Sequence, residues 1–284
     1  EQRFTPTAVA FLRQLLEAGL QQVVQSEGQG TLLPQFNGVY LNDCSRVEWL
    51  AAGVKLAVRW ELQHGQLEMR LRELRENDQK SEVVDGPLPK GALNLNDLGF
   101  FKLARFQRWN EQGVYWLTRF KVGTTLFTAQ GEVLDLLPLL ESLSGPVCLP
   151  VQVGSTARLP AYLVAAPLPP EALQKRMARL KEQARLDQRP LSPRQAAFAH
   201  WTIYLTNIPH LTFDQAHTLA RTRWQIELLF KLWKSHGQIL HARTADPCRQ
   251  LCLGYAKLLA VLVAHWLLLV TGWSHDTLGS LDAL

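Results

Sequence analysis

The chain has 284 residues, of which 47% are hydrophobic and 19% are charged. This composition excludes a disordered chain and predicts a packed globular protein, either one large domain or a core with a sizeable insertion. The formal net charge of +5 is a mild basic excess, compatible with a polyanionic partner. Four cysteines lack the spacing of a disulfide framework, which favours a reducing cytoplasm. They are Cys44, Cys148, Cys248 and Cys252.

Residues 1–121 alternate between helical and strand patterns. Apolar residues recur at helical spacing over residues 6–24, and a second helix is predicted from Gly99 to Gln112, closed by Gly113. This mixed order indicates an α/β sheet with helices packed on it. The predicted strands are residues 38–43, 54–62, 66–72, 92–97 and 114–121, with a hairpin turn at His64-Gly65.

The pattern changes at residue 122, where glycine and proline become frequent and short strand-like runs occur at 147–153 and 157–166. Residues 171–194 then carry seven basic and three acidic residues, a net charge of +4. Such a run could grip a DNA backbone, although a solvated helix face is its commoner explanation. We interpret residues 122–199 as an insertion of mostly β structure with a basic helix.

The last part of the chain returns to longer elements. A strand is predicted at residues 201–206 and a long helix from about Thr212 to His236. The run Leu258–Leu269 is strongly apolar but contains His265. Because a membrane span needs about 20 apolar residues, this run predicts a buried core helix and no membrane association. The start of the chain has no signal-peptide pattern.

Two aspartates have the same local context. Asp43 and Asp97 each end a predicted short strand, and each follows an asparagine. Ligand sites in open α/β sheets gather at the carboxyl ends of strands, and paired carboxylates suit Mg²⁺. For either aspartate alone, an ordinary strand-end residue that caps the next turn is the simpler interpretation.

The predicted long helix carries a third acid on a basic stripe. At 100° per residue, Arg223, Glu227 and Lys234 fall within about 40° of one another. An adjacent apolar sector would pack on the sheet, which leaves Glu227 near the sheet edge and the two basic residues free to hold phosphates. A solvated face with an ordinary Arg–Glu pair is the alternative. The apolar sector consists of Ile226, Leu229, Phe230 and Trp233.

The spacing of this stripe resembles the Tyr-Arg-Glu-Lys box of DDE-type insertion-sequence transposases. The match rests on Arg223, Glu227 and Lys234, and Leu205-Thr206-Asn207 resembles the segment that precedes the box. The contexts Asp43-Cys44-Ser45 and Asp97-Leu98-Gly99 are similar to those of the family's first two catalytic aspartates. The sequence departs from the family pattern in two places. Ala220 stands where the box tyrosine is expected, and Leu98 where a basic residue is usual.

The resemblance implies a ribonuclease-H-like mixed sheet flanked by helices, with a β-rich insertion before the last catalytic helix. Residues 38–121 would form the first part of the core, residues 122–199 the insertion, and residues 200–284 the second part with the C-terminal helices. The chain begins with Glu1 and not Met. We therefore expect residues 1–37 to be a helical segment at the end of a truncated DNA-binding region.

The resemblance also implies an activity and its site. Asp43, Asp97 and Glu227 would hold two Mg²⁺ ions, with Mn²⁺ able to replace them, and cut-and-paste transposition would proceed by DNA cleavage and strand transfer. Double-stranded DNA would be the partner, bound by a homodimer in the bacterial cytoplasm at the nucleoid. The DNA-binding residues would be Arg223, Lys234, Trp201, Arg119 and Lys121. Trp201 would stack on an extruded base, although a place in the sheet core fits an apolar strand equally well.

Other interpretations remain open. The chain could be a catalytically weakened, DNA-binding transposase remnant, or a nuclease of the same fold that transfers no strands. A structural protein whose acids only cap turns would bind no metal. A zinc site is a further alternative, although its spacing fits no common zinc finger. Its ligands would be His236, His241, Cys248 and Cys252.

Overall fold

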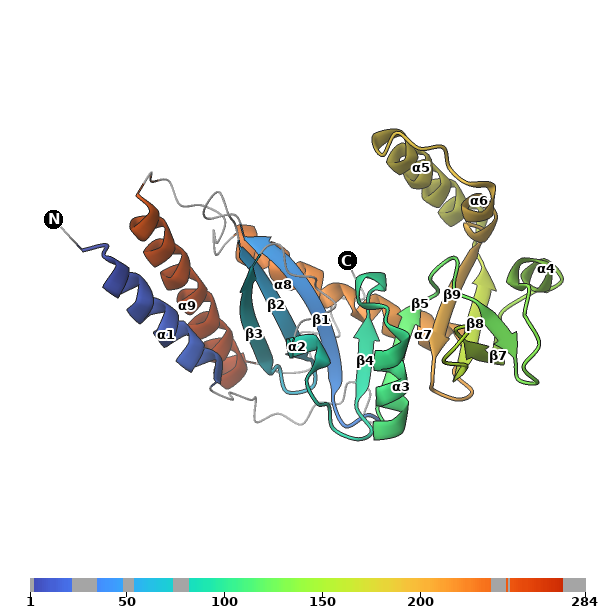
Figure 1. Cartoon of the computed structure of the whole chain (residues 1–284), viewed down its shortest axis with the longest axis horizontal. Helices are drawn as coiled ribbons and strands as arrows, with labels where there is room; N and C mark the ends of the chain where they lie inside the picture. The colour runs from blue at the N-terminus through green and yellow to red at the C-terminus, as the bar shows by residue number, and fades with distance from the viewer. Residues whose placement is uncertain are drawn as a thin grey trace. The chain divides into compact units, whose positions relative to one another are not determined.

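A computed structural model describes residues 3–21, 35–47, 54–73, 82–235, 244 and 246–272. The chain divides into two compact units (Figure 1). The first unit combines residues 1–95 with residues 223–284, and the second comprises residues 96–222. Both contain strands and helices, so the predicted mixed α/β class is confirmed.

The first unit is built on a sheet with the strand order β3-β2-β1-β4. Strands β1, β2 and β3 pair antiparallel, whereas β4 runs parallel to β1. The elements are α1 (Pro6–Gln21), β1 (Val39–Val47), β2 (Val54–Glu61), β3 (Leu67–Glu73), α2 (Glu82–Asp85), β4 (Leu93–Asn96), α8 (Trp224–Ser235) and α9 (Pro247–Gly272). Asn96, the last residue of β4, begins the second unit.

Buried amides join β1 to β4. The parallel ladder aligns Leu41 with Leu95, and Asn42 Nδ2 donates to Asn94 Oδ1 at 3.0 Å. Both asparagines are fully buried, so this bond gives Asn42 Nδ2 and Asn94 Oδ1 a partner in place of the water that they lose on folding. The buried guanidinium of Arg59, which faces Asn42 from β2, donates to Asn42 Oδ1 and to the backbone carbonyls of Gly86 and Pro87. This network fixes the register of the two strands.

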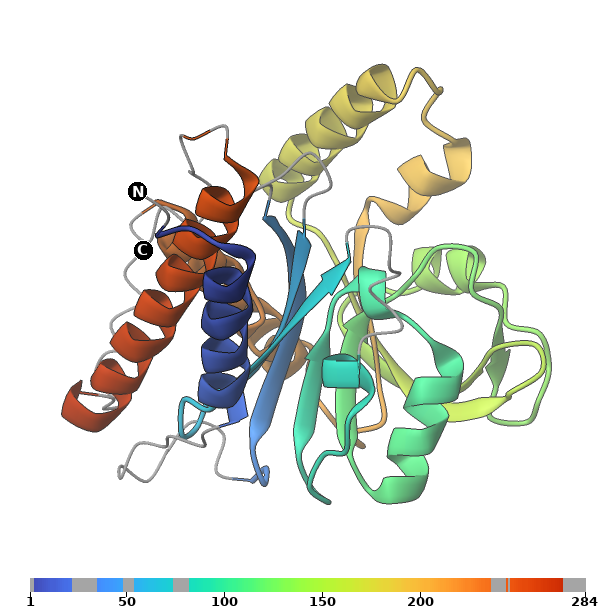
Figure 2. The same cartoon turned by 60° about the vertical axis from the view of Figure 1, so that its left-hand side comes forward.

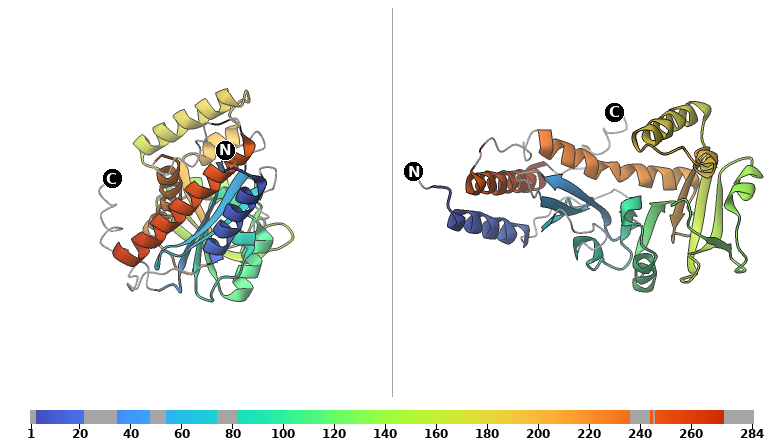
Figure 3. Two further views of the ribbon diagram at one scale, coloured as in Figure 1. Left: turned by 90° about the vertical axis from the view of Figure 1, so that its left-hand side faces the viewer. Right: turned by 45° about the horizontal axis from the view of Figure 1, so that its top comes forward.

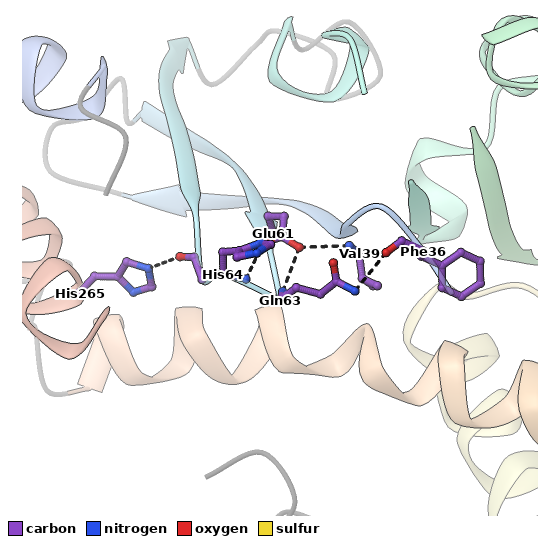
Figure 4. A network of polar contacts seen from close by, with 7 residues as sticks. Phe36, Val39, Glu61, Gln63, His64 and His265 are labelled. Carbon is purple, nitrogen blue, oxygen red and sulfur yellow. Dashed lines mark hydrogen bonds and ion pairs between the residues drawn. The ribbon is translucent and has the colours of Figure 1, made fainter. Parts of the chain in front are cut away.

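A second polar network holds the β2–β3 turn (Figure 4). Glu61 is buried, and its two carboxylate oxygens accept the backbone amides of Val39, Gln63 and His64. From α9, the His265 ring meets the carbonyl of Gly65 in this turn at 2.8 Å. Side chains from a strand and a helix thus fix the turn and the beginning of β1.

Helices α1 and α9 lie side by side (Figure 3). They approach closely at Gly19, where an added Cβ would lie 3.1 Å from the Leu262 side chain. Helix α9 has 26 residues, so the apolar run at Leu258–Leu269 is part of a longer helix than predicted. Its segment Pro247–Leu267 is long and apolar enough to cross a membrane by length and composition alone. One face is nevertheless buried in the unit, at Cys252, Tyr255, Leu258, Leu262 and His265.

The second unit holds a sheet of strand order β5-β9-β8-β7-β6, in which all neighbours pair antiparallel (Figure 2). A short 3-10 helix, η2 (Leu98–Phe100), opens it. The remaining elements are α3 (Leu103–Gln112), β5 (Tyr115–Arg119), β6 (Leu126–Thr128), α4 (Leu136–Glu141), β7 (Val147–Val153), β8 (Leu159–Pro167), α5 (Pro170–Leu186), α6 (Pro193–Phe198), β9 (Trp201–Thr206) and α7 (Phe213–Thr222).

The Leu205-Thr206-Asn207 segment has a structural role in the second unit. Asn207 accepts the backbone amide of Trp116 at 2.8 Å and donates to the carbonyl of Val114 at 2.9 Å. Thr206 Oγ1 donates to the carbonyl of Trp116 at 2.7 Å. The side chains at the end of β9 therefore bind the backbone of β5, and they extend the pairing of these two strands.

Most predicted elements are confirmed, and the largest differences, apart from the length of α9, concern the helix after Thr212 and strand β1. The predicted helix from Thr212 to His236 is split at Arg223, where α7 ends and α8 begins. Thr222 binds back to the carbonyl of Thr218, a side-chain bond that competes with regular helix geometry. Strand β1 continues four residues past Asp43, because β2 pairs with it as far as Val47.

The Asn42–Asn94 bond should make a measurable contribution to stability. We expect Asn42→Ala to lower the free energy of unfolding by about 1–3 kcal/mol, because it leaves a buried amide oxygen unpaired. Urea denaturation measures this change. Asn37→Ala is the matched control, since Asn37 is exposed and donates only at the surface, to the carbonyl of Lys90. If both variants lost the same free energy of unfolding, the buried Asn42–Asn94 bond would not stabilise the register of the two strands.

The buried His265 should make stability depend on pH. Burial lowers the pKa of His265, with the bond to Gly65 acting in the opposite direction. The unfolded chain therefore binds more protons than the folded chain below its ordinary pKa of about 6.5, and stability falls as pH falls through that region. We expect the wild type to lose more unfolding free energy than His265→Gln between about pH 7.5 and about pH 5. Equal losses in urea titrations would show that His265 does not contribute.

Candidate active site

Asp43 lies within β1, two residues beyond Leu41, the last residue of β1 that the parallel ladder with β4 aligns. Strand alternation places its side chain on the opposite face of the sheet from the buried Asn42. The carboxylate is half-buried, and its Oδ1 accepts the backbone amide of Cys44 at 2.7 Å. Asp43 therefore lies just beyond the end of the parallel ladder between β1 and β4.

Asp97 occupies the equivalent place after β4, two residues beyond Leu95. It precedes the 3-10 helix η2 as its N-cap residue, and among the described residues no amide of that helix donates a hydrogen bond to its carboxylate. Its carboxylate is therefore not the turn cap that the simpler interpretation of the sequence expects. Asp97 belongs to the second unit, whereas Asp43 and Glu227 belong to the first.

Glu227 is carried by α8, which packs against β1. Ile226, Phe230 and Trp233 are the buried residues that anchor the helix, as predicted, while Leu229 is only half-buried. The side chain of Glu227 is 42% exposed, and its Oε1 accepts a bond of 2.5 Å from Arg223 Nη2. The predicted Arg–Glu pair is thus present at the beginning of α8.

One pocket of the first unit brings Asp43 and Glu227 together. It has a volume of about 500 Å³ and takes its walls from β1 and α8. Two acidic residues and two lysines therefore line one cavity, a combination that suits a divalent cation beside a phosphate. The lining residues are Asp43, Cys44, Ser45, Glu227, Phe230, Lys231, Lys234 and Ser235.

Lys231 is a candidate that the sequence interpretation did not include. It lies four residues after Glu227, which is one helical turn, and three before Lys234. The i,i+4 relation to Glu227 was available in the sequence. A lysine at this spacing is nevertheless usual on solvated helices, and only the pocket separates Lys231 from other exposed lysines.

The remaining DNA-binding candidates lie in the second unit. Arg119 and Trp201 line a separate pocket of about 310 Å³. Trp201 is only 9% exposed, as expected for a residue of the sheet core. Lys121 does not line that pocket, and its ammonium lies 5.9 Å from the centroid of the Phe101 ring. The structure therefore brings together two of these three residues.

The described part of the chain contains no group of three or more His, Cys, Asp and Glu side chains placed to hold a metal ion. Of the proposed zinc ligands, His236 and His241 lie outside the described residues. Cys248 and Cys252 lie one turn apart on α9, and burial raises the pKa of the Cys252 thiol. A raised pKa disfavours the thiolate that binds zinc.

Comparison with known proteins supplies a family. The model of the transposase DDE domain matches residues 53–263, which include Asp97 and Glu227 and begin after Asp43. The transposase for insertion sequence element IS231F of Bacillus thuringiensis subsp. israelensis is 27% identical over 92% of this chain. The transposase for IS1151 of Clostridium perfringens is 28% identical over 61% of the chain. A putative transposase InsL for IS186A of Escherichia coli K12 is also 28% identical, over 60%.

The matched regions cover only part of these relatives. They span 63% of the IS231F protein, 41% of the IS1151 protein and 46% of the IS186A protein. The chain therefore spans about two fifths to three fifths of the length of the relatives it matches. The matched family model agrees with the mixed sheet flanked by helices that the ribonuclease-H-like fold requires.

The Arg223–Glu227 pair should contribute little to stability. Because Glu227 is substantially exposed, we expect Arg223→Ala to change the free energy of unfolding by no more than about 0.5 kcal/mol. Urea denaturation at low and high salt measures this. A loss of about 2 kcal/mol or more would identify Arg223 as a structural residue and would argue against a role in holding phosphate.

Proposed function

The chain belongs to the family of transposases with a DDE domain, and we propose that it cleaves DNA and transfers strands at the ends of an insertion sequence. The observation that carries the proposal is the pocket in which Asp43 and Glu227 meet Lys231 and Lys234. The family match supplies the reaction class, and the pocket supplies the charged groups that such a reaction needs.

We propose Asp43, Asp97 and Glu227 as the ligands of two Mg²⁺ ions, which Mn²⁺ can replace. Carboxylate oxygens are the donors that Mg²⁺ prefers, and the half-exposed state of Asp43 and Glu227 leaves room for water and a phosphate. When bound, a pair of such ions activates the attacking oxygen and stabilises the leaving oxygen of an in-line displacement. Asp43 and Asp97 follow equivalent positions of the β1–β4 ladder, which supports a shared role.

The basic residues have a distinct task in this proposal. Lys231, Lys234 and Arg223 would hold DNA phosphates at the mouth of the pocket, and they would offset the charge that the backbone brings to the carboxylates. Arg223 is 16% exposed and already donates to Glu227, so it also orients that carboxylate. Orientation and charge balance are the main protein contributions to phosphoryl transfer.

In the second unit, Arg119 and Lys121 would contact the DNA backbone, and Trp201 would stack on an extruded base. Base stacking suits an indole, but the low exposure of Trp201 suits the sheet core as well. We further propose that the protein acts as a homodimer on double-stranded DNA in the bacterial cytoplasm. A catalytically weakened remnant is the second candidate, favoured by Ala220 and Leu98, and a nuclease without strand transfer is the third.

The decisive experiment is a nicking assay with Mg²⁺ on a duplex that carries the terminal sequences of the element. We expect Asp97→Asn to reduce nicking by at least about a thousandfold, because a neutral amide is a poor Mg²⁺ ligand. Asp135→Asn is the matched control, since Asp135 is an exposed aspartate of the same unit that begins α4. Wild-type nicking by Asp97→Asn would exclude the proposed site.

Two further readouts separate the alternatives. Binding of Mn²⁺ measured by isothermal titration should weaken in Asp43→Asn and in Glu227→Gln, whereas a protein without a metal site shows no binding at all. Joined products identify a transposase, and cleavage without joining identifies a nuclease.

The Trp201 assignment has its own test. If Trp201 stacks on an extruded base, Trp201→Ala should nick at the normal rate but form few DNA hairpins. An unchanged hairpin yield would show that Trp201 only packs in the sheet core. Reduced thermal stability with normal products would lead to the same conclusion.

A further inference from the structure

We propose that Arg119, Arg176, Tyr204 and His217 form a binding site for a phosphodiester group of the DNA backbone, separate from the carboxylate pocket. The four residues line the pocket of about 310 Å³ in the second unit. The residues of the pocket by themselves indicate that the bound group is a phosphate-like anion. The proposal rests on the proposed function only in assigning that anion to the DNA backbone.

Strand pairing brings two of the four side chains to one face. Arg119 on β5 is aligned with Tyr204 on β9, and aligned residues of an antiparallel pair project from the same face of the sheet. Thr202 lies two residues before Tyr204 and shares that face. Trp201, at the beginning of β9, also lines the pocket.

Helix α5 supplies the second arginine. Arg176 Nη1 donates to the carbonyls of Trp201 and Ala199, at 2.7 and 3.3 Å, and its Nη2 donates to Thr202 Oγ1 at 3.2 Å. All three partners are neutral, so these bonds fix the guanidinium without cancelling its charge. Six other basic residues of the segment 171–194 are exposed. Of the seven basic residues in this segment, Arg176 is the one whose side chain contacts β9. This contact distinguishes it from the basic residues of a solvated helix face.

Helix α7 supplies an imidazole next to a buried phenol. Tyr204 is buried, and its hydroxyl lies 2.8 Å from His217 Nδ1. Phe213, one turn earlier on α7, stacks on the His217 ring with the centroids 5.6 Å apart. The ring is therefore fixed on one edge by the phenol and on one face by the phenylalanine. Among the residues that the structure describes, none makes a hydrogen bond with its Nε2.

The charges of the pocket are unbalanced. None of its lining residues, all of which lie within the described second unit, carries a carboxylate. The two arginines influence each other, because Arg119 contributes to lowering the pKa of Arg176 after burial. Burial, Arg221, Arg119 and Arg176 lower the pKa of His217, and Asp214 opposes them. Adjacent cations of this kind attract an anion, and a guanidinium pair with an imidazole suits phosphate oxygens.

Binding of an anion should raise the pKa of His217. An anion stabilises the imidazolium, so its binding is expected to strengthen as pH falls through the pKa of His217. The charged groups that act on this ring are Arg119, Arg176, Arg221 and Asp214. The Tyr204 phenol also contacts it, and burial raises the pKa of that phenol.

The experiment follows the imidazole signals of the full chain by nuclear magnetic resonance, with His217→Gln used to assign the His217 signal. Sulfate is the first probe, because its charge does not change near neutral pH, and a short DNA duplex is the second. We expect both probes to shift the His217 signal and raise its pKa. Arg176→Gln and Arg119→Gln should each weaken sulfate binding about tenfold, which corresponds to the loss of one charged hydrogen bond.

Arg158→Gln is the matched control, because Arg158 is an exposed arginine of the same unit that stacks on Phe127 outside the pocket. Its His217 response should equal that of the wild type. Arg119 is exposed, so Arg119→Gln remains informative if Arg176→Gln fails to fold.

A response to sulfate but not to the duplex would overturn the DNA assignment and indicate a site for free phosphate. No response to either probe, or an equal response in Arg119→Gln, would overturn the site itself. None of these readouts requires metal or nicking, so failure of this site and failure of the proposed catalytic function give different results.

Discussion

The parallel pairing of β1 with β4 is the constraint on which the candidate active site depends. It is the parallel contact of a sheet whose other described pairs are antiparallel, and it joins segments about 50 residues apart. Register is the critical variable, since a slip of one residue would turn every side chain of a strand to the other face. The buried Asn42–Asn94 bond opposes such a slip, because a displaced amide would lose its partner without regaining water.

The same alternation separates Asp43 from the buried amides. A strand residue next to a buried polar side chain faces the opposite side of the sheet. Asn42 and its partner Asn94 therefore join the strands from one face, and the face of Asp43 is left for α8 and its glutamate. Arg59 extends the buried network toward β2, where its charge is met by backbone carbonyls and by Glu68 at 3.5 Å. The sheet thus separates the buried polar network that stabilises the strands from the carboxylates of the candidate active site.

The sequence predicted elements well where a local pattern determines them. Strand β9 and strand β7 have the predicted limits, because apolar strand residues and turn residues mark both ends. Gly113 closes α3 at φ 68°, the left-handed conformation that favours glycine. The length of β1 was wrong because its last residues depend on pairing with β2, which a single strand does not encode. The break at Arg223 likewise falls within a continuous helical pattern.

The candidate site residues show the same difference between features set by local sequence and features set by tertiary contacts. Glu227 and its basic neighbours were predicted from helical spacing, whereas Lys231 and Arg176 become candidates only through tertiary contacts. Arg176 is one of seven basic residues in a segment that predicts a solvated face, and nothing local distinguishes it. Its role follows from where α5 meets β9. Leu98 lines the same pocket and adds no charge, so Arg119 and Arg176 supply its positive charge. Leu98 stands where the family usually has a basic residue, and the basic residues of this pocket come instead from positions 119 and 176, farther along the sequence.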